Sequence, residues 1–347
     1  MKKIKIIVSG GGTGGHYYPA VAVLKEIKKN YDAEILYFTT DGRIEEKKLK
    51  YDFPEAKSEK VFLTGFRRPL YNPANIKIIL KMFSEKNRIK KIIKNFNPDF
   101  GFMTGGYICG PVGIALKELK IPFYLHEQNS VMGITNKKLL PDAEKVFYSF
   151  EESCKGTNCI KTGNPVRTPS EIINRSLLTK YGIKDLSKKI ILVMGGSLGS
   201  KEIDDIMIKM YEKSEDCEFI HISQDIKKEN LPQNIHIFDY IDKMENILPV
   251  IDGIISRGGA TTISEILFYK INSLIIPWRD AAEDHQTKNA LFLKSRGLAE
   301  IVNGNDPDYT LIEKFLNNIS PKKSDYIYFP EKNPSVEKIV KNIDELK

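Results

Sequence analysis

The sequence predicts an α/β protein with two doubly wound parallel sheets, one in each half of the chain. Short apolar runs alternate with helical patterns along most of the 347 residues, as in sheets that carry helices on both faces. Twice, a strand pattern runs into a cluster of glycines and then a helical pattern, at residues 10–15 and 195–199. A turn-forming Gly-Asn-Pro stands between the halves at residues 163–165. Together these features predict a first domain of residues 1–164 and a second of residues 165–332.

Each expected strand is a short apolar run bounded by polar or turn-forming residues. In the first domain these runs are residues 2–9, 33–39, 61–64, 99–104, 122–127 and 145–148. In the second domain they are residues 189–194, 218–223, 235–238, 253–256 and 273–277. Several are apolar on both faces, as buried parallel strands require. Helical patterns are expected at residues 170–181 and 335–346.

The composition predicts an ordinary soluble globular protein. Hydrophobic residues make up 41% and charged residues 28% of the chain, and no apolar run approaches the ~18–20 residues of a transmembrane helix. A strand pattern begins at Lys2, so we expect no signal peptide. The four cysteines have neither a Cys-x-x-Cys pair nor a metal-binding spacing, which predicts reduced thiols in a cytoplasmic protein.

The charge is unevenly distributed along the chain. Residues 1–165 hold 28 Lys and Arg against 17 Asp and Glu, a net charge of +11, whereas the rest of the chain carries −3. A basic half suits nucleic acid, an anionic membrane or an anionic substrate, and solubility alone accounts for it equally well. One basic segment is amphipathic, because Ile76, Ile79, Met82 and Phe83 follow a helical spacing among lysines. It can lie on an anionic bilayer or be an ordinary helix that faces the core.

The first glycine cluster contains a G-x-G-x-x-G pattern formed by Gly10, Gly12 and Gly15. Such a turn can offer backbone N–H groups and a helix dipole to a phosphate, or it can be a tight turn without a ligand. A dinucleotide is disfavoured, because no acidic residue ends the second strand at the usual distance of ~20 residues. His16 follows the glycines at a helix N-terminus, which keeps its ring neutral and makes it the candidate general base.

Two further loops are expected at the carboxyl ends of strands, where α/β sheets bind ligands. Gly105, Gly106 and Tyr107 follow the fourth strand and form either a second phosphate site or a simple turn. Glu127 and Asn129 follow the fifth strand. Glu127 is therefore the next candidate base after His16.

The second half contains two polar strand–helix connections. In residues 256–265, small residues allow close backbone approach, and Glu265 can accept both hydroxyls of a ribose or act as a helix-dipole partner. In residues 277–290, the amides of Gln286 and Asn289 share a helix face and suit sugar hydroxyls. No Asp-x-Asp follows a strand, so a metal held by paired aspartates is not expected.

In this order, the segments resemble the GT-B glycosyltransferases and, among them, the MurG family. The motifs that carry the resemblance are GGTGGHYYPA (11–20), GGYICGP (105–111), LHEQN (125–129), GNPVR (163–167), GGSLG (195–199), SRGGATTISE (256–265) and DHQTKNA (284–290). The resemblance spans nearly the whole chain. It implies two Rossmann-like domains across a cleft, with a C-terminal helix in residues 333–347 that packs back on the first domain.

The resemblance also implies an activity. Members of the family transfer N-acetylglucosamine from UDP-N-acetylglucosamine (UDP-GlcNAc) to undecaprenyl-pyrophosphoryl-N-acetylmuramyl-pentapeptide in peptidoglycan synthesis. The implied enzyme inverts the anomeric carbon in a single displacement, giving a β-1,4 link. It works as a peripheral protein at the cytoplasmic face of the plasma membrane. It needs no cofactor or metal, and nucleic acid is not a partner.

Site residues follow from the matching motifs. The implied donor contacts are Thr13, Gly14, Gly15, Asn129, Arg167, Ser197, Ile241, Ala260, Thr261, Thr262, Ile263, Ser264, Glu265 and Gln286. His16 would be the catalytic base, and the candidate acceptor contacts are Gly105, Gly106, Tyr107 and Glu127. His285 departs from the glutamine that many members carry, which leaves its role in reading the sugar open.

Three other functions remain as alternatives to this implied activity. The first is another GT-B enzyme, such as a diacylglycerol glycosyltransferase or a UDP-sugar epimerase. The second is a non-catalytic UDP-sugar-binding protein, which His16 in the glycine turn argues against. The third is an NAD-dependent oxidoreductase, which the missing ribose acid disfavours.

Overall fold

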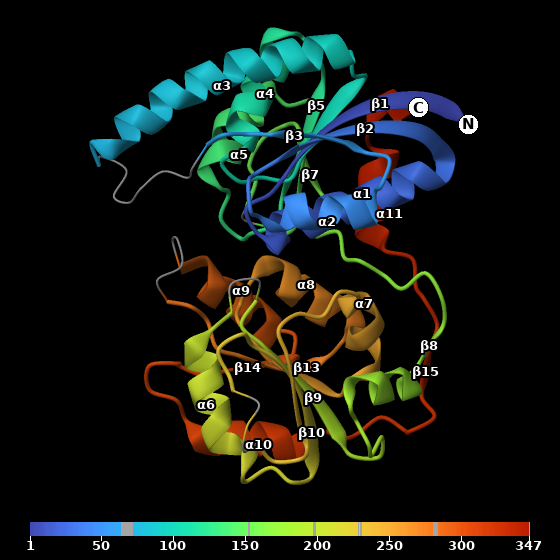
Figure 1. Ribbon diagram of the computed structural model, residues 1–347, viewed down its shortest axis with the longest axis vertical. Coiled ribbons are helices and arrows are strands. Elements are labelled where there is room, and N and C mark those ends of the chain that lie inside the picture. Colours follow the sequence, from blue (N-terminus) through green and yellow to red (C-terminus); the bar gives the residue numbers. More distant parts are fainter. Residues whose placement is uncertain are drawn as a thin grey trace. The chain divides into compact units, whose positions relative to one another are not determined.

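The chain forms two compact units in the computed structural model (Figure 1). The structure describes residues 1–63, 72–151, 153–196, 199–227, 229, 231–279 and 284–346, without the side chains of residues 74, 75, 79, 83 and 345. The first unit contains Met1–Arg167 together with Asn333–Lys347, and the second contains Thr168–Lys332.

The first unit is built on a parallel seven-stranded sheet in the order β3-β2-β1-β4-β5-β6-β7. Its strands are β1 (Lys2–Ser9), β2 (Tyr31–Thr39), β3 (Lys57–Lys60), β4 (Phe100–Met103), β5 (Phe123–Glu127), β6 (Lys145–Tyr148) and β7 (Cys159–Lys161). Its helices are α1 (Gly14–Asn30), α2 (Ile44–Asp52), α3 (Ala74–Phe96), α4 (Cys109–Glu118), α5 (Ile134–Leu139) and α11 (Pro334–Lys341). Two short 3-10 helices, η1 (Leu140–Asp142) and η5 (Asp344–Leu346), complete it.

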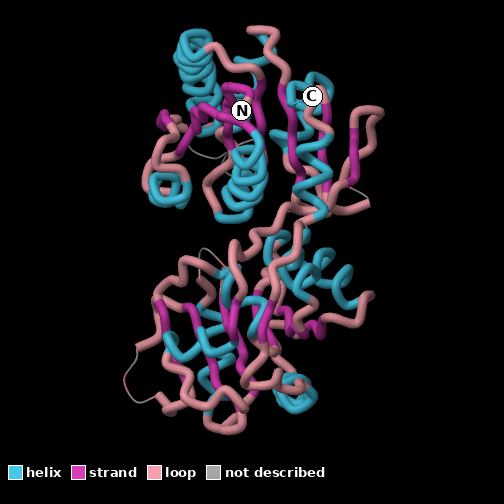
Figure 2. Tube along the Cα trace, turned by 90° about the vertical axis from the view of Figure 1, so that its right-hand side faces the viewer, coloured by secondary structure: helices cyan, strands magenta, loops and turns pink. Residues whose placement is uncertain are grey.

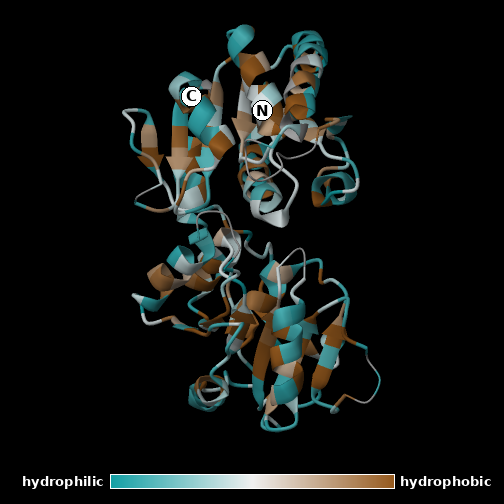
Figure 3. Cartoon of the chain, turned by 90° about the vertical axis from the view of Figure 1, so that its left-hand side faces the viewer, coloured by the Kyte–Doolittle hydropathy of each residue, from teal (hydrophilic) through white to brown (hydrophobic). Residues whose placement is uncertain are grey.

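Apolar side chains of β1 alternate between two cores on opposite faces of this sheet. Ile4, Ile6 and Val8 join α1, α2 and α11 in one cluster, whereas Ile7 joins α3, α4 and α5 in the other. This alternation follows from the two-residue period of a strand. Figure 3 shows the strands as mostly hydrophobic segments. The sheet is therefore covered on both faces, as its apolar strands predict.

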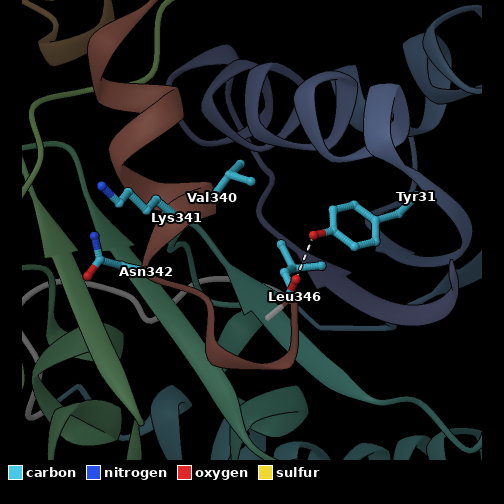
Figure 4. A pocket seen from close by; sticks show the side chains of 5 residues that line it. All are labelled: Tyr31, Val340, Lys341, Asn342 and Leu346. Atoms are coloured by element: carbon cyan, nitrogen blue, oxygen red, sulfur yellow. Dashed lines mark hydrogen bonds between the residues drawn. The ribbon is translucent and has the colours of Figure 1, made fainter. Parts of the chain in front are cut away.

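The C-terminal segment belongs to the first unit. Ile339 and Ile343 are fully buried in the core beside α1, and the Tyr31 hydroxyl donates to the Leu346 carbonyl oxygen at 2.6 Å. Figure 4 shows this contact at a surface hollow that is also lined by Val340, Lys341 and Asn342. The chain thus leaves the first unit after Arg167 and returns to it at Asn333.

The second unit repeats the architecture, with strands lying among helices (Figure 2). Its main sheet is parallel and six-stranded, in the order β11-β10-β9-β12-β13-β14. Its strands are β9 (Lys189–Met194), β10 (Cys217–Ile222), β11 (Ile235–Phe238), β12 (Gly253–Ser256), β13 (Asn272–Ile275) and β14 (Ala299–Ile301). Its helices are α6 (Lys201–Tyr211), α7 (Met244–Ile247), α8 (Ala260–Tyr269), α9 (His285–Lys294) and α10 (Tyr309–Asn318), with the 3-10 helices η2 (Arg175–Tyr181) and η3 (Leu248–Val250). A separate antiparallel pair joins β8 (Ile173–Asn174) to β15 (Ile327–Tyr328).

A fully buried ion pair anchors the start of the second unit. The Arg175 guanidinium donates to both Asp252 carboxylate oxygens, at 3.1 and 2.7 Å, and to the carbonyl oxygens of Leu186, Lys188 and Val250. The same carboxylate accepts from the backbone N–H groups of Ile190 and Lys322. These bonds connect the entering segment at Arg175 and the leaving segment at Lys322 to the beginnings of strands β9 and β12.

The structure differs from three sequence expectations. Residues 170–181 form β8 and a 3-10 helix instead of an α-helix, because Asn174 pairs with β15 and Arg175 turns into the core. The third strand is the polar β3, not residues 61–64, of which Thr64 lies outside the described residues. A hydrophobic pattern misses an edge strand whose side chains face solvent. β7 and β14, each of three residues, were also not predicted.

The expectation of four reduced thiols was wrong. Cys154 and Cys159 form a disulfide, and the turn between them brings their Cα atoms to 6.0 Å, within bonding range. Cys109 and Cys217 are free and buried. The five-residue separation of the bonded pair is not a Cys-x-x-Cys spacing, so the local pattern did not reveal it.

Replacing Asp252 should destabilise the second unit strongly. Asp252→Asn leaves the buried Arg175 charge uncompensated, and we expect a loss of about 3–5 kcal/mol in the free energy of unfolding, measured by urea denaturation. The matched control is Asp216→Asn, which breaks the more exposed Lys189–Asp216 pair and should cost about 0–1 kcal/mol. Equal losses in the two variants would contradict an anchoring role for the buried pair.

Candidate active site

The topology of the first unit brings two glycine loops together. β1 and β4 are neighbours at the point where the strand order reverses, and Ser9 lies opposite Met103 in their register. The turn at residues 10–13 and the loop at residues 104–108 therefore begin at the same edge of the sheet. In open α/β sheets this switch point is where ligands bind.

The glycines of the second loop pack directly on the first. A methyl group on Gly106 would lie 2.8 Å from the Gly11 carbonyl oxygen, and one on Gly105 would lie 3.2 Å from the His16 ring. Both glycines also have positive φ angles, of 91° and 100°. Close approach therefore explains why glycine stands at these two positions, whether or not a phosphate binds there.

The first glycine turn is not a cradle of bare N–H groups, as the sequence had suggested. The Gly12 N–H already donates to the Glu45 carboxylate, with its oxygens at 3.0 and 3.1 Å, and the Thr40 N–H donates to it as well. Glu45 is fully buried at the start of α2. A buried carboxylate thus holds the tip of the turn and repels an anion at that N–H.

His16 lies in the first turn of α1, as expected, and is oriented by oxygen atoms of two other segments. Its Nδ1 is 2.9 Å from the Thr104 carbonyl oxygen and 3.1 Å from Oε1 of Gln128. The Thr104 hydroxyl donates to the His16 carbonyl oxygen at 2.6 Å. The histidine is thereby held at both its ring and its backbone by the neighbouring loops.

Glu127 is committed to the loop that follows it. One carboxylate oxygen accepts from the backbone and side-chain N–H groups of Asn129, and the other accepts from Gly133 N–H and the Asn136 amide at 2.9 Å. Glu127 is only 2% exposed. These bonds favour a positioning role over that of a second general base.

Arg167 lies beside the first glycine turn within the same unit. Its guanidinium stacks on the Tyr18 ring, 3.7 Å from the centroid, and that ring packs against Gly14. Tyr107 lies next to Gly12, since a methyl group on this glycine would be 3.7 Å from the tyrosine ring. A cation and a helix N-terminus therefore converge near His16, which favours an anionic ligand.

The second unit has the same switch-point arrangement. β9 and β12 are neighbours, with Met194 opposite Ser256, so the loops after both strands begin at one edge. Gly258 packs on the backbone of Gln286. The Asn289 amide donates to the Gly258 carbonyl oxygen at 3.0 Å. Ser197 lies outside the described residues.

The expected donor residues of this unit differ in what they can offer. Ile263 is fully buried and Ile241 is 5% exposed, so their side chains belong to the interior. The Ser264 hydroxyl donates to the Ala260 carbonyl oxygen within α8, and Oε1 of Gln286 accepts from the Trp278 N–H. Thr261 and Thr262 are partly exposed on the first turn of α8, and Glu265 is 6% exposed one turn further on.

The amphipathic segment divides along α3. Ile76 and Leu80 are 61% and 66% exposed, whereas Ile89 and Ile93 are fully buried in the core. Met82 packs against that core, which removes it from the expected membrane face. The side chains of Ile79 and Phe83 lie outside the described residues. None of the described helices is both long and apolar enough to span a bilayer.

Sequence reasoning missed three residues of this region, Glu45, Gln128 and Asn136. Glu45 and Asn136 lie on helices outside the glycine motifs, and Gln128 was noted only as part of LHEQN. Their side chains reach the site only because the folded sheet brings segments that are distant in sequence together. Among the described residues, no group of three or more His, Cys, Asp or Glu side chains is arranged to hold a metal ion.

Comparison with known proteins identifies the family. Residues 6–148 match the glycosyltransferase family 28 N-terminal domain, and residues 190–346 match its C-terminal domain. A protein of Thermosipho melanesiensis is 40% identical over 322 residues, covering 92% of this chain and 90% of its own length. It is named as a UDP-N-acetylglucosamine–N-acetylmuramyl-(pentapeptide) pyrophosphoryl-undecaprenol N-acetylglucosamine transferase.

The chain belongs to the MurG family. A relative from Thermotoga maritima with the same name is 36% identical and covers 92% of this chain and 93% of its own. One from Bacillus cytotoxicus is 34% identical and covers 91% and 89%. The resemblance inferred from the motifs is thereby confirmed.

Solved structures confirm the predicted fold class. The crystal structure of MurG from Acinetobacter baumannii has a TM-score of 0.70 at 23% identity and covers 99% of this chain and 100% of its own. A UDP-GlcNAc 2-epimerase from Methanocaldococcus jannaschii reaches a TM-score of 0.61 at 14% identity, covering 98% of both chains. At these identities the likeness concerns the fold alone, so the epimerase does not revive that alternative function.

Adding one methyl group at Gly106 should test the contact between the glycine loops. We expect Gly106→Ala to lower the free energy of unfolding by about 1–3 kcal/mol more than Gly42→Ala, because only Gly106 is crowded. Gly42 is the matched control, since it also has a positive φ of 70° but nothing within 4 Å of the added methyl. Urea unfolding measures the difference, and equal destabilisation would show that the loops do not pack as described.

Proposed function

We propose that this chain transfers N-acetylglucosamine from UDP-GlcNAc to the 4-hydroxyl of undecaprenyl-pyrophosphoryl-N-acetylmuramyl-pentapeptide, converting lipid I to lipid II in peptidoglycan synthesis. The observation that carries the proposal is His16, held by neutral oxygen atoms at the switch point of the first unit. The names of relatives at 34–40% identity, each covering most of this chain, support the same reaction.

His16 is the general base in this proposal. The acceptor hydroxyl loses its proton to the ring as its oxygen attacks the anomeric carbon, and the bond from that carbon to the diphosphate breaks. This is one displacement with inversion, which gives a β-1,4 link and UDP. Histidine is the side chain most often used for such a proton transfer.

The remaining site residues divide between substrates in this proposal. Glu265 and the first turn of α8 bind the nucleoside, with Glu265 on the ribose, and Gln286 contacts the sugar through its Nε2 group. Arg167 and backbone N–H groups stabilise the negative charge that develops on the leaving diphosphate. Gly105, Gly106 and Tyr107 line the acceptor side.

The enzyme would act as a peripheral protein at the cytoplasmic face of the plasma membrane. Its acceptor carries a long lipid, and the exposed Ile76 and Leu80 of α3 lie beside Lys77 and Lys81. An apolar face within a basic surface favours binding to anionic lipid. We assign the membrane contact to the N-terminal half of α3, because its C-terminal half is committed to the core.

Removing the His16 ring tests the proposed reaction. His16→Ala should lower single-turnover transfer from UDP-GlcNAc to the lipid-linked acceptor by about 10²–10⁴, while UDP affinity measured by calorimetry stays near wild type. The control His236→Asn changes a histidine paired with Glu218 in the second unit and should leave transfer unchanged. A near-normal His16→Ala rate with an unchanged pH profile would rule out the base. A raised KM with normal kcat would assign His16 to acceptor binding instead.

Membrane binding should depend on the exposed face of α3. Ile76→Ser combined with Leu80→Ser should reduce co-sedimentation with vesicles of anionic phospholipid, and salt should weaken wild-type binding, because the Debye length falls from ~10 Å at 0.1 M to ~3 Å at 1 M. The control pair, Ile172→Ser with Ile208→Ser, removes two isoleucines of the second unit that are also exposed, at 57% and 45%. If both pairs bind vesicles like wild type, α3 is not the docking face.

A further inference from the structure

A continuous chain of hydrogen bonds runs from His16 into the interior of the first unit. Both atoms near the His16 Nδ1 are carbonyl-type oxygens, of Thr104 and Gln128, which can only accept. Nδ1 must therefore carry the proton. In the neutral ring, Nε2 is then left with its lone pair, which is the form that a general base needs.

The orientation of the Gln128 amide is set independently of His16. Its Nε2 lies 2.8 Å from the Thr104 carbonyl oxygen and 3.0 Å from Nδ1 of His126. The reversed amide would place two carbonyl oxygens 2.8 Å apart without a proton between them, so the nitrogen must face Thr104. The Oε1 atom is thereby directed to His16. Gln128 is only 1% exposed, which restricts it to this arrangement.

His126 closes the far end of the chain. Its Nε2 is 3.1 Å from the Gly163 carbonyl oxygen, so this nitrogen donates and Nδ1 accepts from Gln128. His126 is fully buried, and desolvation lowers its pKa to about 4. It stays neutral near pH 7, and the two histidines carry opposite tautomers with Gln128 between them.

We propose that Gln128 is a positioning residue that, together with the Thr104 carbonyl oxygen, holds His16 in its Nδ1–H tautomer, so that Nε2 is available as the base. This inference rests on the proposed function for its catalytic consequence, but the tautomer itself is independent of that function. The partner is an amide where many catalytic histidines have a carboxylate. An amide orients the ring without adding the negative charge that would stabilise the imidazolium.

The charged groups around His16 are held in fixed roles. Glu45 caps the glycine turn from α2, and Glu127 on β5 is bonded to its own loop. Cys109 on α4 is buried, which raises its thiol pKa to about 12. Tyr107 lies over Gly12, and Arg167 stacks on Tyr18. His126, at the far end of the hydrogen-bond chain, is neutral as well.

The test uses the full-length protein and three variants. Gln128→Met removes the acceptor at similar volume, and Gln128→Glu replaces it by a carboxylate. Asn158→Leu is the matched control, because it deletes a part-buried amide that donates to two carbonyl oxygens, those of Leu140 and Ala143, away from His16. Ring nitrogens of ¹⁵N-histidine-labelled protein are measured by NMR, with His16 assigned from the His16→Ala spectrum.

The wild type should show His16 with protonated Nδ1 and unprotonated Nε2 at pH 8. Gln128→Met keeps the Thr104 carbonyl oxygen but removes the second acceptor of Nδ1–H. The fraction of the Nε2–H tautomer should therefore increase and kcat should fall about 10-fold, as expected for one neutral hydrogen bond, with the KM for UDP-GlcNAc unchanged. Gln128→Glu should move the acid limb of the kcat profile to higher pH by about 1 unit or more, because a nearby carboxylate stabilises the imidazolium. Asn158→Leu should leave both the tautomer and the profile as in wild type.

A wild-type His16 in the Nε2–H tautomer would overturn the proposal, and this measurement needs no Gln128 variant to fold. A Gln128→Met protein with an unchanged tautomer and kcat would overturn it as well. If instead the tautomer depends on Gln128 while His16→Ala retains full transfer, the positioning stands and only the catalytic role of His16 fails. The two proposals are therefore separable.

Discussion

The pairing of β1 with β4 is the constraint on which the rest of the first unit's site depends. It sets the two glycine loops side by side, and their packing leaves no room for a side chain at Gly106 and little at Gly105. His16 enters the space between these loops, with its ring on Gly105 and its backbone bonded to Thr104. The position of the candidate base is therefore a consequence of strand order and glycine packing, and not of the helix that carries it.

Around this base, the unit uses its buried carboxylates for structure and neutral groups for orientation. Glu45 holds the first glycine turn, and Glu127 holds both the loop at Asn129 and helix α5 at Asn136. The groups that contact the His16 ring are the Thr104 carbonyl oxygen and the Gln128 amide. The hydrogen-bond partners of the imidazole Nδ1 are therefore neutral oxygen atoms, not carboxylates.

The second unit repeats the strand order but stabilises its entry differently. Its buried Arg175–Asp252 pair joins both segments that cross between the units to the start of the sheet. Buried pairs of this kind are costly to break because each charge is desolvated.

The two halves of α3 in the first unit differ in their surroundings. One half completes the core, and the other leaves apolar side chains exposed among lysines.

The sequence by itself determined the fold class, the positions of most strands along the chain and the family, because apolar runs, glycine turns and ordered motifs are local features. It also placed His16 at a helix N-terminus beside glycines. It did not reveal the edge strand β3, whose side chains are polar, or the Cys154–Cys159 disulfide, which depends on a turn. Only the tertiary structure decided the roles of Glu45, Gln128 and Glu127. Each of these acts through groups at the ends of other strands or on other helices, and their contacts exist only once the sheet has brought those segments together.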